Sequence, residues 1–124
     1  MDISNWSKSH FCAYILLYVA HADDRAEEEE MIYIENFLTK LGIEESNPKD
    51  VHAIMLEVMP VFLRHSQSLR TNFVKTKWKL FYSEEEDMSS LLDEIEEMII
   101  VDFNIHKSEI KAYGEIRKAL GILH

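Results

Sequence analysis

The sequence predicts an all-α protein, and three observations support this fold class. Only 3 glycines and 2 prolines interrupt the 124 residues. Apolar residues recur at helical spacing through most of the chain. A helix, an acidic corner and a second helix occur twice. With 47% hydrophobic and 29% charged residues the composition is globular, and we expect one domain over residues 1–124, a compact bundle of about six or seven helices.

The first helical hairpin is predicted in the N-terminal third. The spacing predicts helices over roughly Asn5–Ala22 and Glu27–Leu41, joined by an acidic corner. Gly42 stands where a left-handed helix cap is expected, because glycine has no Cβ that clashes in this conformation.

The middle of the chain is predicted to form further helices. Asn47 and Pro48 are typical of a helix start, since asparagine caps a first turn and proline fits its first position. Pro60 is expected to kink this helix or to begin another. Ser83 and the three glutamates after it predict the start of the next helix. The side chains expected in the core of this region are Phe62, Leu69, Phe73, Leu80 and Phe81.

The C-terminal third repeats the first hairpin. An offset of 79 positions (120 − 41) superimposes two Leu-Gly-Ile tripeptides and the apolar positions before them. We expect the two helices of this copy over roughly Glu84–Val101 and Lys107–Leu120, with Gly121 as the left-handed cap.

The two corners share two acidic residues. Asp23 aligns with Asp102, and Glu30 aligns with Glu109. One explanation is structural, because a glutamate at the third helical position can accept a hydrogen bond from the amide before the helix, and the aspartates can accept from loop amides. The residues at the two N-cap positions, a glutamate and a histidine, are not preferred caps, so ordinary capping leaves part of the pattern unexplained.

The other explanation is a divalent cation. Ca²⁺, Mg²⁺ and Mn²⁺ take oxygen ligands, whereas Zn²⁺ more often takes nitrogen and sulfur. The spacing is not that of an EF-hand, and the sequence lacks the histidine motifs of zinc proteases and di-iron bundles. The candidate metal ligands are Asp23, Glu30, Asp102 and Glu109.

An enzyme is the alternative. In a metal-dependent enzyme the same four carboxylates would be the ligands, and His21 or His106 would transfer protons. The sequence contains no glycine-rich phosphate loop, and Cys12 shows no catalytic partner. We therefore favour a non-enzymatic protein with no catalytic residues.

Charge is unevenly distributed along the chain. The net charge of −10 disfavours nucleic acid and anionic membranes as partners. From Val58 to Ser83 there is no acidic residue and the formal charge is +5, which leaves −15 (−10 − 5) for the rest. These cations either pair with glutamates of neighbouring helices or form a docking face for an acidic protein partner, with a tryptophan as its anchor. The residues of this face are Arg64, Arg70, Lys75, Lys77, Trp78 and Lys79.

The predicted location is the cytoplasm. Cys12 cannot form an internal disulfide and is expected to be reduced and buried. The apolar run that ends at Ala20 imitates a signal peptide, but we expect it to be retained because the repeat uses it as a helix. No apolar run approaches the roughly 20 residues that cross a bilayer. A homo-oligomer is compatible with these features.

The doubled corner resembles the TerB-like family. These small α-helical domains are associated with tellurite resistance and also occur at the N-terminus of a DnaJ-type membrane co-chaperone. Their pattern is an apolar helix that ends in Ala-Asp-Gly, a glutamate seven positions after the aspartate, and a helix that closes in Leu-Gly. The matching segments are HADDRAEEEEMIYIENFLTKLGI and IVDFNIHKSEIKAYGEIRKALGI.

The resemblance covers most of the chain, with two departures. The glycine of the family pattern is replaced by Asp24 and Phe103, and the serine or threonine cap by Glu27 and His106. The resemblance implies a helical bundle, an acidic surface that binds divalent metal, and a non-catalytic role in stress-response assemblies. We therefore expect a TerB-like interaction module.

Overall fold

The described part of the chain is a bundle of helices. The computed structural model describes residues 6–20, 28–44, 51–82, 89–100 and 107–121. All regular structure in these ranges is helical, which confirms the all-α prediction. In chain order the helices are α1 (Lys8–Ala20), α2 (Glu28–Glu44), α3 (Val51–Arg64), α4 (Gln67–Lys77), the 3-10 helix η1 (Trp78–Leu80), α5 (Ser89–Ile100) and α6 (Lys107–Ala119).

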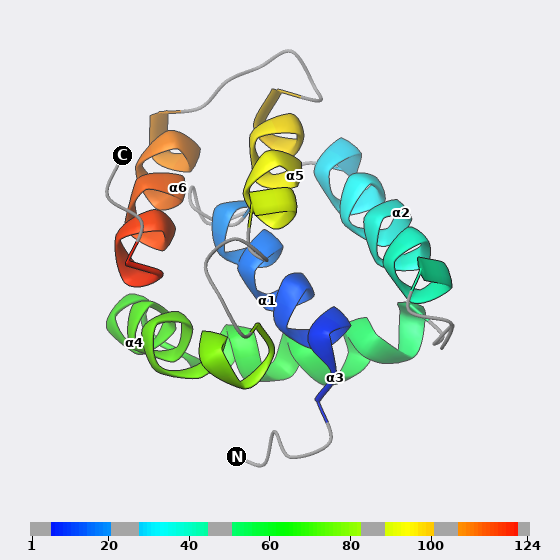
Figure 1. The fold of residues 1–124 in the computed structure, drawn as a ribbon, viewed down its shortest axis with the longest axis horizontal. Coiled ribbons are helices and arrows are strands. Elements are labelled where there is room, and N and C mark those ends of the chain that lie inside the picture. The colour runs from blue at the N-terminus through cyan, green and yellow to red at the C-terminus, as the bar shows by residue number, and fades with distance from the viewer. Residues whose placement is uncertain (1–5, 21–27, 45–50, 83–88, 101–106, 122–124) are drawn as a thin grey trace.

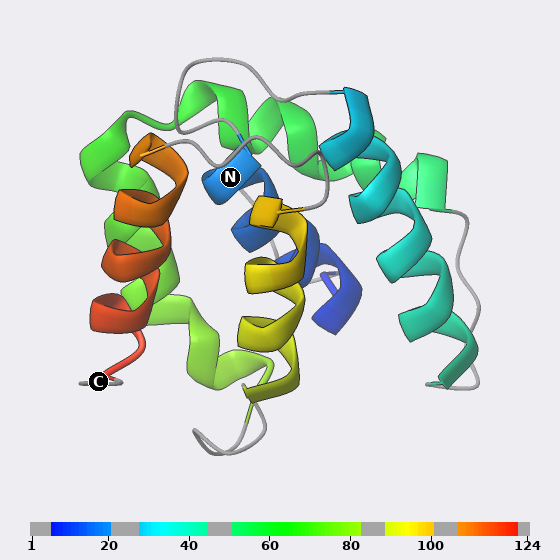
Figure 2. The ribbon, with the colours of Figure 1, turned by 90° about the horizontal axis from the view of Figure 1, so that it is seen from above.

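Helix α1 is the centre of this bundle. It packs against α2, α3, α5 and α6, and every residue from Ser9 to Ala20 is buried. Figure 1 shows α1 surrounded, with α3 along one side of the bundle and α5 between α2 and α6. The view from above in Figure 2 gives the same order of α6, α5 and α2. A helix that is apolar on all faces is stable in water only in such a central position.

The predicted repeat is present in the fold. Helix α2 begins at Glu28 and α6 begins at Lys107, which are 79 positions apart like the two Leu-Gly-Ile tripeptides. Gly121 has a positive φ of 78°, so it forms the left-handed end that was predicted after α6.

The first hairpin ends differently from the prediction. Helix α2 continues through Gly42 to Glu44, so the predicted end at Leu41 was wrong. Glycine costs only about 1 kcal/mol in a helix interior, which does not force a helix to end there.

Two predictions for the middle of the chain were only partly correct. Of the two outcomes expected at Pro60, a kink in the helix or the start of another helix, the second does not occur, because Pro60 lies inside α3. The boundary comes later, at Ser66, whose hydroxyl accepts a hydrogen bond from the amide of Leu69 (3.3 Å) and caps α4. Leu69 and Leu80, which were expected in the core, are exposed. Phe62 and Phe73 are buried as predicted, and Phe81 packs against the core.

Helix α1 is apolar along most of its length. Even so, no helix within the described ranges is long and apolar enough to cross a membrane. Cys12 is a buried thiol within α1, and its Sγ lies 2.9 Å from the hydroxyl oxygen of Tyr82.

Candidate functional site

The shared glutamates of the two corners occupy equivalent and buried positions. Glu30 and Glu109 are each the third residue of their helix, and each is only 1% exposed. A carboxylate in a first turn is stabilised by the free amides and the positive end of the helix. Both explanations of the corners, a capping interaction and a cation ligand, require this placement.

The other predicted ligands lie outside the described residues. These are Asp23 and Asp102, together with His21 and His106. Within the described ranges no three side chains of His, Cys, Asp or Glu are grouped so that they could hold a metal ion. The first turns of α2 and α6, the helices that carry Glu30 and Glu109, lie on opposite sides of α5 in both views (Figures 1 and 2).

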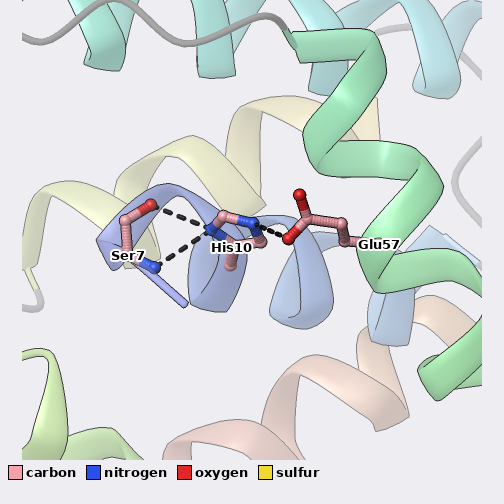
Figure 3. A network of polar contacts seen from close by, with 3 residues as sticks. All are labelled: Ser7, His10 and Glu57. Carbon is pink, nitrogen blue, oxygen red and sulfur yellow. Dashed lines mark hydrogen bonds and ion pairs between the residues drawn. The ribbon is translucent and has the colours of Figure 1, made fainter. Parts of the chain in front are cut away.

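A serine, a histidine and a glutamate form a polar chain at the start of α1 (Figure 3). His10 Nδ1 lies 3.0 Å from both the backbone nitrogen and the hydroxyl oxygen of Ser7, and His10 Nε2 lies 2.8 Å from Glu57 Oε2. Because the Ser7 amide donates to Nδ1, the proton of a neutral ring is on Nε2 and is donated to Glu57.

This chain of residues is a helix cap and not a catalytic triad. Ser7 precedes the first residue of α1, and His10 is the third helical residue, where a glutamate often accepts from the capping amide. The His10 ring is only 3% exposed. The spacing of Ser7 and His10 could have signalled the cap, but the contact with Glu57 on α3 spans 47 positions and has no local signal.

Two tyrosines of α1 connect the core to the surface. The Tyr14 hydroxyl lies 2.7 Å from His65 Nδ1, and burial raises the pKa of this phenol. The Tyr18 hydroxyl donates to Glu115 (2.7 Å) and lies 2.8 Å from Thr71 Oγ1, and burial raises its pKa to about 12. These contacts tie α1 to α4, to α6 and to the segment between α3 and α4.

The outer face of α5 carries carboxylates that accept from tyrosines. Tyr33 of α2 donates to Glu94 and to Glu97 (3.0 Å), and Tyr113 of α6 donates to Glu96 (2.8 Å). Burial, followed by these hydrogen bonds, raises the pKa of both phenols. A shallow groove of about 270 Å³ lies here between α2 and α5, lined by Tyr33, Asn36, Phe37, Lys40, Glu94 and Glu97.

The predicted docking segment separates into two parts. The lysines of its C-terminal part reach solvent, since Lys75 and Lys79 are exposed and Lys77 is partly exposed. Within the described ranges none of them forms a salt bridge. Trp78 is only 8% exposed and belongs to the core, so it does not present an exposed anchor. Leu80, which is 67% exposed, is the apolar side chain that accompanies the lysines.

The arginines lie at the other end of the segment, where α3 meets α4. Arg64 Nε donates to the carbonyl of Pro60 (3.1 Å), and Arg70 Nε donates to the carbonyl of Phe62 (3.2 Å). The Arg70 guanidinium carbon lies 3.8 Å from the centre of the Phe62 ring. The Phe62 carbonyl, which also accepts from the His65 amide (3.2 Å), is one of the last four carbonyls of α3, so the Arg70 contact helps to complete this helix end.

The comparisons with known proteins add no relative. No protein-family model matches the chain, and no curated protein or solved structure resembles it significantly.

Proposed function

We propose that this chain is a non-enzymatic, TerB-like interaction module of the cytoplasm that acts in a stress response by docking a protein partner. The docking site is the lysine face, which we define as Lys75, Lys77, Lys79 and Leu80. The observation that carries this proposal is that the three lysines make no salt bridge in the described ranges while a largely exposed leucine directly follows Lys79 in the chain.

The physical argument is one of complementarity. The lysines stand in a stretch without acidic residues, so this face is positive on a chain whose net charge is −10. Positive and apolar groups side by side favour an acidic surface with apolar side chains, because charge steers the encounter and apolar burial holds the complex. The doubled corner and its resemblance to the TerB-like family support the choice of an interaction module.

Affinity isolation from the native host tests the proposal. The wild-type chain is compared with Lys75→Gln/Lys77→Gln/Lys79→Gln and with a control of equal charge, Lys40→Gln/Lys111→Gln/Lys118→Gln. We expect one partner to be captured by the wild type and the control and to be reduced about tenfold or more in the lysine-face variant. Equal capture by all three proteins, or no reproducible partner, would refute the proposed function.

The buried glutamates favour a second candidate function, divalent-cation binding at the corners. Removing a carboxylate from water is costly unless hydrogen bonds or a cation compensate, and Glu30 and Glu109 repeat this burial at equivalent positions. The proposed ligands are these two glutamates with Asp23 and Asp102.

Thermal unfolding with millimolar Ca²⁺, Mg²⁺ or Mn²⁺, and with Zn²⁺ for comparison, tests the cation site. A ligand of the folded state raises stability by about 2.7 kcal/mol at a hundred times its Kd. We expect Asp23→Asn/Asp102→Asn to lose this shift and the exposed control Glu35→Gln/Glu96→Gln to keep it. No shift with any of these ions, or a shift that both variants keep, would remove the cation site.

A further inference from the structure

The segment between α3 and α4 concentrates positive charge around one histidine. Burial lowers the pKa of the His65 imidazole, and the charges of Arg70 and Arg64 lower it further. Its Nδ1 already lies 2.7 Å from the Tyr14 hydroxyl. Two permanent cations therefore act on one imidazole.

Both guanidinium groups are held in place by a hydrogen bond from Nε. Each uses Nε for a carbonyl of the last turns of α3, and Arg70 also stacks on Phe62. No described residue contacts the terminal amino groups of either arginine through a hydrogen bond or salt bridge. The pair of terminal nitrogens of a guanidinium can bind the two oxygens of a carboxylate end-on.

The carboxylates of Glu57 on α3 and Glu115 on α6 have partners other than the two arginines. Glu57 accepts from His10, and Glu115 accepts from Tyr18 and from Gln67 (3.0 Å). No acidic residue occurs between Val58 and Ser83. Arg64 and Arg70 both act electrostatically on His65, so their like charges lie in one neighbourhood, and an incoming anion would reduce the repulsion between them.

Exposed apolar side chains accompany the arginines. Leu63 precedes Arg64 in the chain and is 58% exposed, and Leu69 precedes Arg70 and is 53% exposed. We name these four residues with His65 the arginine corner. Its chemistry is a pair of anchored guanidinium groups with a leucine adjacent to each in sequence.

We propose that the arginine corner binds an acidic, leucine-containing segment of the protein partner, with side-chain carboxylates held end-on by Arg64 and Arg70. This inference rests on the proposed interaction function and specifies the chemistry of the partner. Because both guanidinium groups are already fixed by Nε contacts, binding costs little side-chain entropy. Arginine suits these two positions because its five donors have a fixed planar geometry, so Nε can bind a carbonyl while the terminal nitrogens face a carboxylate.

Titration of the isotopically labelled full chain with a synthetic peptide of leucine and glutamate tests this proposal. NMR resolves the Nε–H group of each arginine, and we expect the signals of Arg64 and Arg70 to shift while that of Arg117 on α6 stays in place. Raising the salt concentration should weaken binding, because exposed charge pairs are screened. A peptide of leucine and lysine should not bind.

Variants separate recognition from the capping role. We expect Arg64→Gln/Arg70→Gln to weaken peptide binding about tenfold or more, and Arg64→Lys/Arg70→Lys, which keeps the charge, to bind with intermediate affinity. The control of equal charge, Arg117→Gln/Lys118→Gln, should bind like the wild type. Circular dichroism identifies any variant that does not fold. If the glutamine variant does not fold, Arg64→Lys/Arg70→Lys provides the test.

The outcomes also distinguish this inference from the proposed function. If binding is lost in the lysine-face variant but kept in the arginine variants, the interaction module stands and the arginine corner is overturned. If inorganic phosphate shifts the two arginine signals while the acidic peptide does not, a carboxylate partner is overturned. If Arg117 shifts as strongly as Arg64 and Arg70, the binding is non-specific and the corner is again overturned.

Discussion

Helices α1 and α5 occupy equivalent places in the two hairpins but have different surroundings. At the 79-residue offset Leu16 aligns with Ile95, and both side chains are fully buried. The next position holds Leu17 in α1, which is buried, and Glu96 in α5, which is exposed. One motif can therefore form a central helix when apolar residues cover all of its faces, or an outer helix when carboxylates cover one face.

The second helices, α2 and α6, differ in another way. After the first turn they bury different faces: Ile34 and Leu38 are buried in α2, whereas Ala112 and Ile116 are buried in α6. At the 79-residue offset these pairs do not coincide. The glutamate at the third position is nevertheless buried in both helices. The burial of this glutamate is therefore determined by the corner and not by the face that the following helix packs against the core.

The largest expected effect is at the position that differs most between α1 and α5. Leu17→Glu places a charge in the centre of the bundle, where an unpaired charge costs several kcal/mol and can exceed the roughly 5–15 kcal/mol that hold a domain together. We expect this variant not to fold, as measured by the loss of helical circular dichroism.

The reciprocal substitution at the aligned position is the control. Glu96→Leu changes an exposed residue of α5 and should alter the free energy of unfolding by about 1 kcal/mol or less. If both variants folded equally well, α1 would not be the central helix and the contrast between the hairpins would be lost.

The sequence predicted the features that depend on local pattern. It did not predict the features that depend on how the helices pack together. The helical class, the third-position glutamates and the cap at Gly121 follow from spacing and residue type. Gly42 matches the same cap pattern, but nothing local decides whether a helix stops or continues there. Leu69 and Leu80 fit a helical period equally well on an inner or an outer face, so their exposure needed the packing of α4.

The candidate sites show the same division. The alignment of the two corners identified Glu30 and Glu109, because both belong to one repeated local motif. Counting charges identified the positive segment but not its two parts. The structure separates them, because Trp78 is buried in the core and the arginines bind carbonyls near the end of α3. Contacts between residues far apart in sequence, such as His10 with Glu57, carry no periodic signal.

The corners provide the next test, in which the two hairpins should behave alike. Glu30→Gln and Glu109→Gln each remove a buried carboxyl group at the start of a helix, and we expect each to lower the free energy of unfolding by about 1–3 kcal/mol. Urea unfolding of the two single variants measures this directly. A large loss in one variant and none in the other would mean that the corners are not equivalent, whatever their alignment.

A smaller effect is expected at the aligned pair of Tyr18 in α1 and Glu97 in α5. Tyr18→Phe removes the hydrogen bonds to Thr71 and Glu115 and should cost about 1–2 kcal/mol at neutral pH. Substituting the aligned residue, Glu97→Gln, changes an exposed side chain and should cost less than about 0.5 kcal/mol.

The Tyr18 contribution should also depend on pH. Its pKa is raised to about 12 in the folded state, against 10.0 for an ordinary tyrosine. The folded state therefore holds this proton more tightly, so the contribution is complete below pH 10 and is lost as the pH rises from 10 to about 12. Unfolding measured across this range should show a smaller decline in Tyr18→Phe than in the wild type, and identical declines would contradict the assignment.

The smallest expected effect is on the outer face of the second hairpin. Tyr113 donates to Glu96, whose side chain is exposed, so Tyr113→Phe should cost only about 0.5 kcal/mol. Arg117 lies 5.6 Å from the centre of the same ring, and phenylalanine keeps that contact.

A double-mutant cycle of Tyr113 with Glu96, run beside a cycle of Tyr18 with Glu115, isolates the two hydrogen bonds. The coupling should be larger for Tyr18, because its hydroxyl is attached to the central helix and is shielded from water. Equal couplings would show that burial of α1 does not strengthen its polar contacts, and the difference between the two hairpins would then be one of apolar packing alone.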